Sequence, residues 1–342
     1  MDKSAHIPMK WVGPLQVCGD VLQGEYEVPL ATFEKPLWPS VARGARVSML
    51  SGKGICCSVV DERMTRSVLF ETPDAATAIN VVRDIEKIRE DLKKVVQETS
   101  RFATLIDFHV EMVAYLLFIR FEFSTGDAAG HNMCTQAAEA LMNHLVEKFP
   151  VLKYGSLSGN YCSDKKATAV NGILGRGKHV IAEVVIPEKI CQRYLKTSPE
   201  KLVKLTFHKN WVGSTLAGGL RSANAHFANM LLAFYLATGQ DAANIVEGSQ
   251  GTTFAEVRNG DLYFSVSLPH LIVGTVGNGK ELAFVQESMK RLDLLADRPV
   301  GENARRLACL CAATVLCGEL SLLAALTNPD ELMNAHRRLE RK

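Results

Sequence analysis

The hydrophobic pattern is clearest between residues 68 and 156. Apolar residues recur at helical spacing from Ile79 to Val95, and charged residues occupy the other face. Alternating stretches at 106–112 and 115–123 predict two paired strands, and a second helix is predicted from about 132 to 148. A strand, a helix, two strands and a helix in this order predict a small α+β sandwich.

A long apolar segment runs from 307 to 326 and is close to membrane-spanning length. Its only charged residue is Glu319, and a charge inside lipid is costly. We therefore expect a helix buried in a protein core and no membrane partner. Further strands are predicted at 54–60 and 180–186, and a capped helix is expected to open at Thr72-Pro73.

The composition is that of an ordinary globular protein. The chain has 342 residues, of which 47% are hydrophobic and 22% charged, which leaves room for one large domain or two smaller ones. A net charge of +2 argues against nucleic acid as a partner. Nine cysteines without zinc-site spacing predict free, mostly buried thiols and a reducing, cytoplasmic location.

The most informative polar run is Ser-Leu-Ser-Gly-Asn-Tyr-Cys-Ser-Asp-Lys-Lys at 156–166, which predicts a loop. Asp164 can hold one of the adjacent lysines, Lys165 or Lys166, by a charge-assisted hydrogen bond and leave the other pointing outward. A lysine fixed in this way can stabilise an oxyanion on a substrate carbonyl. Taken by itself, the run favours an ordinary solvated loop.

Two acids elsewhere are candidates for the same chemistry. Glu34 lies between apolar residues, so we expect partial burial to raise its pKa and make it a general acid, although Lys35 would act in the opposite direction. Asp241 ends an apolar helix, where an unpaired acid would be costly to bury, and Lys165 is its proposed partner.

Together these stretches resemble the catalytic domain of 3-hydroxy-3-methylglutaryl-coenzyme A (HMG-CoA) reductases. The loop at 156–166, Gly-Asp-Ala-Ala-Gly-His-Asn-Met at 126–133, Ser-Arg-Phe at 100–102 and Gly-Gln-Asp at 239–241 follow the family's order. Phe33, Lys35, Ala129 and His131 depart from its pattern.

The resemblance implies an α+β fold, a large domain built around a long central helix and interrupted by a small ferredoxin-like insert that binds NADP. The implied division is 1–67 and 157–330 for the large domain, 68–156 for the insert and 331–342 for a mobile C-terminal flap.

The implied reaction is NADPH-dependent four-electron reduction of HMG-CoA to mevalonate and CoA. It uses two NADPH per turnover and no metal, and coenzyme A is part of the substrate. The implied assembly is a homodimer or higher homo-oligomer with active sites at the subunit interface, where Glu34 and Lys165 come from one subunit and Asp241 from the other.

The resemblance also assigns residues to three roles. The catalytic residues are Glu34, Lys165, Asp241 and His336, the histidine protonating the departing thiolate. The substrate-binding residues are Ser40, Arg43, Arg66, Ser158, Asp164, Lys166, Lys196, Lys209 and Asn229. The cofactor-binding residues are Ser100, Arg101, Asp127, Gly130, His131, Asn132 and Met133.

Several alternatives stay open from the residues. One alternative is a reductase-like protein with a damaged site that only binds CoA esters. The reason to consider it is that Phe33 and Lys35, on either side of Glu34, depart from the family pattern. Another alternative is the same enzyme using NADH as its cofactor couple in the oxidative direction, in which NAD⁺ accepts the hydride. An RNA-binding insert is disfavoured by the near-zero net charge. A P-loop at 172–179 fails because His179 replaces the required Ser/Thr.

Overall fold

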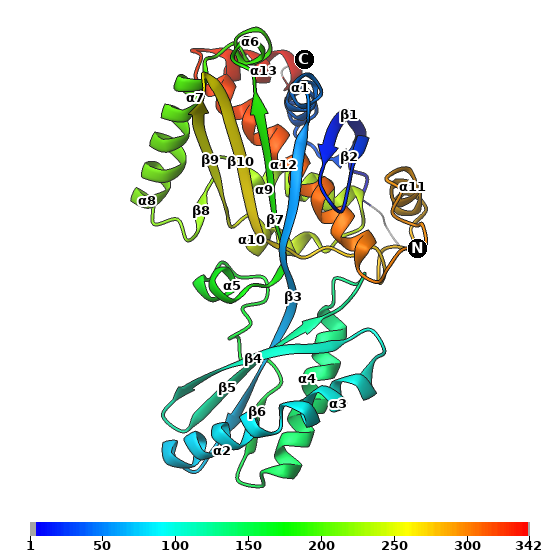
Figure 1. Cartoon of the computed structure of the whole chain (residues 1–342), viewed down its shortest axis with the longest axis vertical. Helices are drawn as coiled ribbons and strands as arrows, with labels where there is room; N and C mark the ends of the chain where they lie inside the picture. The colour runs from blue at the N-terminus through cyan, green and yellow to red at the C-terminus, as the bar shows by residue number, and fades with distance from the viewer. Residues whose placement is uncertain (1–4, 341–342) are drawn as a thin grey trace.

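The structure is a computed structural model of the chain, and it describes residues 5–340. Its upper half in Figure 1 is a mixed sheet with strand order β2-β1-β3-β7-β10-β9-β8, packed on helix α12. The strands are β1 (Met9–Cys18), β2 (Gly24–Ala31), β3 (Ile55–Glu71), β4 (Thr104–Val113), β5 (Leu116–Ser124), β6 (Lys153–Ser156), β7 (Gly177–Ile186), β8 (Ser222–Ala223), β9 (Gly251–Arg258) and β10 (Asp261–Leu271).

The helices are α1 (Leu37–Leu50), α2 (Ala75–Lys87), α3 (Arg89–Thr99), α4 (His131–Lys148), α5 (Ala169–Leu174), α6 (Glu188–Ile190), α7 (Pro199–Leu205), α8 (Ser214–Leu216), α9 (Phe227–Ala237), α10 (Ile245–Gly248), α11 (Ala283–Arg291), α12 (Glu302–Leu326) and α13 (Glu331–Glu340), with π-helical η1 (Cys191–Leu195) and η2 (Thr206–Gly213) and the 3-10 turn η3 (Ala242–Asn244). Helices α2, α3 and α4 lie in the lower half of Figure 1, and most of the other helices pack around the sheet of the upper half.

Helix α12 is the centre of the larger hydrophobic core, as the sequence predicted. From Leu307 to Leu326 its only charged residue is Glu319, so other elements of the protein must surround this part of the helix. Among the described residues it is the one helix long and apolar enough to cross a membrane, and 94% of its apolar window is buried inside the protein. Helix α1 packs closely against it at Gly44. A Cβ added there would lie 2.2 Å from the carbonyl oxygen of Cys317, so this position has no room for a larger residue.

A second hydrophobic core lies in the lower half of Figure 1, between β3, β4 and β5 and helices α2, α3 and α4. The long strand β3 links the halves, since its first part pairs with β1 and β7 and its last part with β5 and β6. The predicted paired strands and second helix are confirmed as β4, β5 and α4.

Two local predictions in this half were wrong. The single helix predicted by the stripe from Ile79 to Val95 is broken at Ile88 into α2 and α3. The cap of α2 is Asp74, whose carboxylate accepts the N–H of Thr77 at 2.7 Å, and not Thr72. Asp74 accepts better than a hydroxyl at a helix N-terminus because it also carries negative charge.

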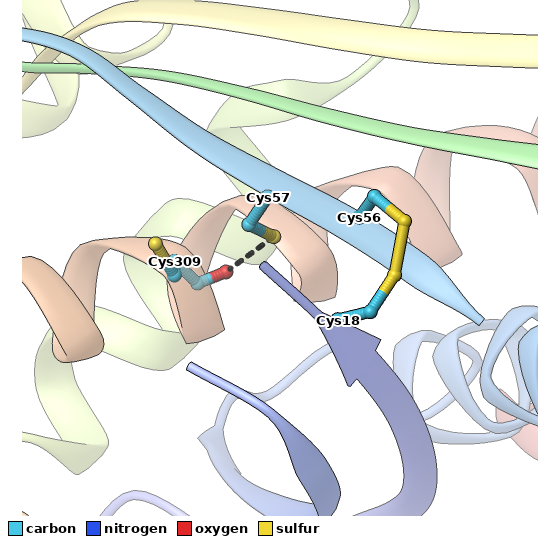
Figure 2. Close-up of a disulfide and its surroundings, with 4 residues drawn as sticks. All are labelled: Cys18, Cys56, Cys57 and Cys309. Carbon is cyan, nitrogen blue, oxygen red and sulfur yellow. Dashed lines mark hydrogen bonds between the residues drawn. A yellow bond between two sulfur atoms is a disulfide. The ribbon is translucent and has the colours of Figure 1, made fainter. Parts of the chain in front are cut away.

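The expectation of free thiols fails for one pair. Cys18 of β1 and Cys56 of β3 form a disulfide (Figure 2), because the two strands pair in parallel and put these residues opposite each other. The other seven cysteines are free and buried, as predicted. One of them, Cys57, donates a weak hydrogen bond to the carbonyl of Cys309 on α12.

Candidate active site

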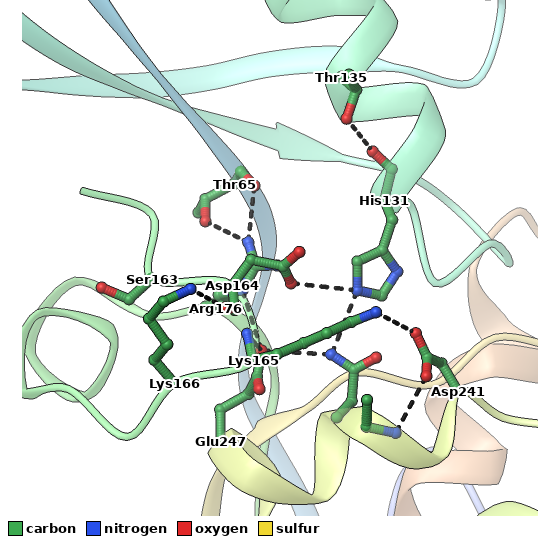
Figure 3. A network of polar contacts seen from close by, with 12 residues as sticks. Thr65, His131, Thr135, Ser163, Asp164, Lys165, Lys166, Arg176, Asp241 and Glu247 are labelled. Carbon is green, nitrogen blue, oxygen red and sulfur yellow. Dashed lines mark hydrogen bonds and ion pairs between the residues drawn. The ribbon is translucent and has the colours of Figure 1, made fainter. Parts of the chain in front are cut away.

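Lys165 lies in the irregular loop between β6 and α5, and its side chain reaches across to Asp241 (Figure 3). Its Nζ is 2.7 Å from Oδ2 of Asp241, whose other oxygen accepts the N–H of Ala243 at 3.0 Å. The hydrogen bond to Asp241 raises the pKa of Lys165, against a smaller opposing effect of burial. The predicted partnership of Lys165 and Asp241 is therefore present in the structure.

Asp164 does not hold a lysine side chain, which corrects the expectation from the loop. Its carboxylate accepts a hydrogen bond of 2.6 Å from Arg176, which is fully buried and also donates to Thr65. Lys166 is exposed, and its Nζ donates a hydrogen bond of 3.0 Å to the main-chain carbonyl of Asp164. Asp164 pairs with Arg176 and not with a lysine because leaving the buried guanidinium unpaired would cost more free energy than leaving an exposed ammonium in water.

Lys165 lines a cavity of about 540 Å³ between the two halves of the molecule. The cavity is also lined by Arg66, Asp164, Asp241, Lys280 and the residues 128–133 at the start of α4. We call it the lysine cavity.

His131 stands in the wall of the lysine cavity. Burial, aided by the charge of Arg176, lowers its pKa to about 4, so its ring is neutral near pH 7. Its Nε2 lies 3.6 Å from Oδ1 of Asp164. A neutral ring can donate or accept a hydrogen bond without adding charge to the cavity.

Asp127 has a structural partner instead of facing this cavity. Its two carboxylate oxygens accept the N–H groups of Gly301 and Ala304 at 2.9 and 3.0 Å. These are free donors at the start of α12, so the side chain caps that helix from a distant loop.

Glu34 lies in a different cavity of about 460 Å³, between α1, α9, α12 and α13. Its Oε2 accepts a hydrogen bond of 2.9 Å from Nδ2 of Asn229. The predicted residues Ser40, Arg43 and His336 line the same space, and so does His226, which the sequence reasoning missed. We call it the glutamate cavity.

Other predicted residues lie at the surface. Ser158 and Lys209 are exposed, and Lys196 lines a cavity beside α13. Ser100 follows α3 and accepts the N–H of Phe102, and the Arg101 guanidinium stacks 4.8 Å from the ring centre of Phe102.

Among residues 5–340, the two main cavities share no lining residue. The expectation that Lys165 and Asp241 come from different subunits is wrong for this structure, because their side chains pair within one chain. Asn229, expected among the substrate-binding residues, contacts Glu34. The close approach of α9 to β2 places Asn229 on the glutamate side.

Glu247 is a buried residue beside Lys165 that sequence reasoning missed. Its Oε1 accepts the main-chain N–H of Lys165 at 3.0 Å. The available signal was an acid inside the apolar turn Ile-Val-Glu-Gly, directly after the run that contains Asp241. An acid in such a place must find partners when it is buried.

Comparison with known proteins decides the family. A model of the hydroxymethylglutaryl-coenzyme A reductase family matches residues 4–341. The chain belongs to this family. It is 44% identical over 338 residues to the HMG-CoA reductase of Pyrococcus horikoshii, which covers 98% of the chain and 81% of that relative. It is 40% identical over 340 residues to the Methanocaldococcus jannaschii reductase, covering 98% and 82%.

The fold is also that of a solved reductase. The class II HMG-CoA reductase of Streptococcus pneumoniae, solved bound to NADPH in open conformations, matches 95% of the chain and 86% of its own length. The TM-score is 0.75 at 20% identity. The predicted α+β fold around a long helix is thereby confirmed.

Proposed function

We propose that this reductase-family chain reduces HMG-CoA to mevalonate and CoA with NADPH. The observation that carries the proposal is the Lys165–Asp241 pair at the wall of a cavity large enough for a substrate. An ammonium held at a fixed place by a carboxylate can stabilise the oxyanion that forms when a thioester carbonyl is reduced. Since Lys165 supplies this charge, the proposed chemistry needs no metal.

NADPH, when bound, supplies the hydride to the carbonyl carbon, and two NADPH are proposed per turnover. The start of α4 fits an anionic dinucleotide. The helix begins after Gly130, which has φ +96° and whose added Cβ would meet Thr125 at 2.6 Å. The first N–H groups of the helix, on His131, Asn132 and Met133, have no partner within the helix and line the lysine cavity. Ser100 and the exposed Arg101 are proposed to hold the 2′-phosphate.

The glutamate cavity is proposed to hold the coenzyme A side of the reaction. His336 protonates the departing thiolate there, and Glu34, fixed by Asn229, supplies a proton to the substrate oxygen. Ser40, Arg43 and Lys196, with Lys209, are proposed to contact the substrate's anionic groups. Arg66 and the lysine-loop residues Ser158, Asp164 and Lys166 are proposed to hold its glutaryl end.

No described residue lines both cavities, so within one chain Glu34 and Lys165 do not face the same space. We therefore propose a homodimer or higher homo-oligomer in which the glutamate cavity of one subunit faces the lysine cavity of its partner. This replaces the earlier division of residues, since Lys165 and Asp241 now belong to the same side.

The division into domains is also a proposal. Two separate hydrophobic cores support an insert at 68–156 within a large domain at 1–67 and 157–330, and α13 forms the proposed flap at 331–342. Residues 1–4 and 341–342 of these ranges lie outside the described part of the chain. A cytoplasmic location stays a prediction, which cell fractionation would check.

A spectrophotometric assay tests the proposed function. Purified protein mixed with HMG-CoA should consume NADPH, with mevalonate as product and a ratio of two NADPH oxidised per mevalonate formed. A protein that binds HMG-CoA without consuming NADPH would instead be the impaired reductase. Faster mevalonate oxidation with NAD⁺ and CoA than reduction with NADPH would favour the oxidative direction.

A further inference from the structure

A buried carboxylate next to the main chain of Lys165 has no role in the proposed mechanism. Glu247 of α10 has no exposed surface, and three donors converge on its Oε1 (Figure 3). They are the main-chain N–H of Lys165 at 3.0 Å, Nε of Arg176 at 3.4 Å and Nδ2 of Asn244 at 3.3 Å. An oxygen that receives three N–H groups is an acceptor, as in an ionised carboxylate. Burial raises the pKa of Glu247, and the N–H of Lys165 and the charge of Arg176 oppose this rise. Its Oε2 has no hydrogen-bond partner among the described residues.

The main chain of Lys165 needs such an anchor. Its φ is +55°, in the left-handed region that residues with a Cβ seldom adopt. A conformation of this kind costs on the order of 1 kcal/mol and persists where surrounding contacts fix it. The hydrogen bond to Glu247 is such a contact, and it comes from an element outside the loop.

Resting on the proposed function, we propose that Glu247 is a positioning residue for Lys165. It fixes the lysine's main chain so that the ammonium meets Asp241, and its negative charge helps to keep that ammonium protonated. In support, the pKa of Lys165 is raised first by its hydrogen bond to Asp241, and the charges of Asp164 and Glu247 add to this effect.

The charged surroundings of Lys165 are closely balanced. Acids and bases reach it from its own loop, from α10, from the turn after α9, from β3, from α4 and from the loop after β10. The acids are Asp164, Asp241 and Glu247, the cations are Arg66, Arg176 and Lys280, and His131 is neutral near pH 7. Burial lowers the pKa of Lys280 to about 8, so this lysine is a cation near pH 7 and largely neutral at pH 9. At either pH, removing the charge of Glu247 takes away one of the three nearby anions and favours the neutral amine of Lys165.

The test separates the two parts of this role. Glu247→Gln keeps an acceptor oxygen and removes the charge, whereas Glu247→Asp keeps the charge and withdraws the oxygen from the Lys165 N–H. Glu256→Gln, at a partly exposed acid of β9 that pairs with Arg258 far from Lys165, is the matched control. The amine of Lys165 is titrated by labelling with acetic anhydride and mass spectrometry across pH, with the exposed Lys153 of the same sample as reference.

In Glu247→Gln, Lys165 should be labelled about 3- to 10-fold faster than in the wild type at pH 9, which corresponds to a lower pKa by about half a unit to one unit. Its kcat should fall about 10-fold, with KM values within about 3-fold and the alkaline limb of the kcat profile moved to lower pH. Glu247→Asp should keep wild-type labelling and still lose kcat.

Wild-type labelling of Lys165 in Glu247→Gln would overturn the electrostatic part, and wild-type kcat in Glu247→Asp would overturn the anchoring part. If Glu247→Gln does not fold, as judged by its thermal transition, the Asp variant still decides the anchoring part. Labelling does not depend on turnover. If the wild type failed to consume NADPH, the proposed function would be contradicted, and the labelling rates would still test the effect of Glu247 on Lys165.

Discussion

Nζ of Lys165 and Oδ2 of Asp241 lie 2.7 Å apart within one chain, whereas Glu34 contacts Asn229 on the wall of another cavity. The reacting groups proposed for one carbonyl are therefore divided between two places on the same subunit. This division makes the reaction depend on assembly, and it leads to predictions that differ for the two sides.

The lysine should carry much of the catalytic effect. Lys165→Ala is expected to lower kcat for HMG-CoA at least about 10²-fold, because it removes the cation that meets the developing oxyanion. Initial rates of NADPH loss measure this. Lys153→Ala, at an exposed lysine of β6, should remain close to wild type. Near-normal turnover of Lys165→Ala would exclude the oxyanion role.

Mixing two inactive variants tests the shared site. Glu34→Gln damages the glutamate cavity and Lys165→Ala the lysine cavity, so a mixed dimer keeps one intact site made of two undamaged halves. Refolding an equal mixture should restore about one quarter of wild-type activity, the statistical value for random pairing in a two-fold dimer. An absence of rescue, with mixed dimers shown by mass spectrometry, would place the whole site within one subunit.

His336 should act on only one of the two reductions. In His336→Gln, reduction of the thioester is expected to slow about 10²-fold, because the thiolate leaves without a proton donor. Reduction of added mevaldehyde releases no thiolate and should be largely intact. Separate rate measurements with HMG-CoA and with mevaldehyde decide this, and equal losses in both would contradict the assignment.

Arg101 should distinguish the two nicotinamide cofactors. Arg101→Ala is expected to raise KM for NADPH about 10-fold and leave KM for NADH nearly unchanged, because the lost contact is to the 2′-phosphate. Arg193→Ala removes another exposed arginine that stacks on a tyrosine ring, and serves as control. An unchanged ratio of the two KM values in Arg101→Ala would remove the assignment.

Asp127 should matter more for stability than for cofactor binding. Asp127→Ala removes the cap of α12 and is expected to lower the free energy of unfolding by about 1–2 kcal/mol, as other lost helix caps do. Denaturant unfolding measures this, and Asp127→Asn should lose less. A rise in KM for NADPH without any loss of stability would restore Asp127 to the cofactor site.

The sequence by itself determined the local elements and the family. The alternation at 106–123 and the apolar run at 307–326 predicted β4, β5 and α12, because the spacing of apolar residues along a chain follows directly from helix and strand geometry. It also named Lys165 as the partner of Asp241, since an acid that ends an apolar helix is costly to bury unpaired.

Apart from the Lys165–Asp241 pair, only the tertiary structure decided which of these polar groups and cysteines meet. Asp164 forms an ion pair with Arg176, and Glu247 accepts a hydrogen bond from the main chain of Lys165. Asp127 caps α12, and Cys18 and Cys56 form a disulfide across paired strands. Each of these contacts joins residues that lie in different elements, so the path of the chain selects the partner. The family resemblance implied that one subunit contributes both Glu34 and Lys165 to a site, whereas the fold of one chain holds them in separate cavities.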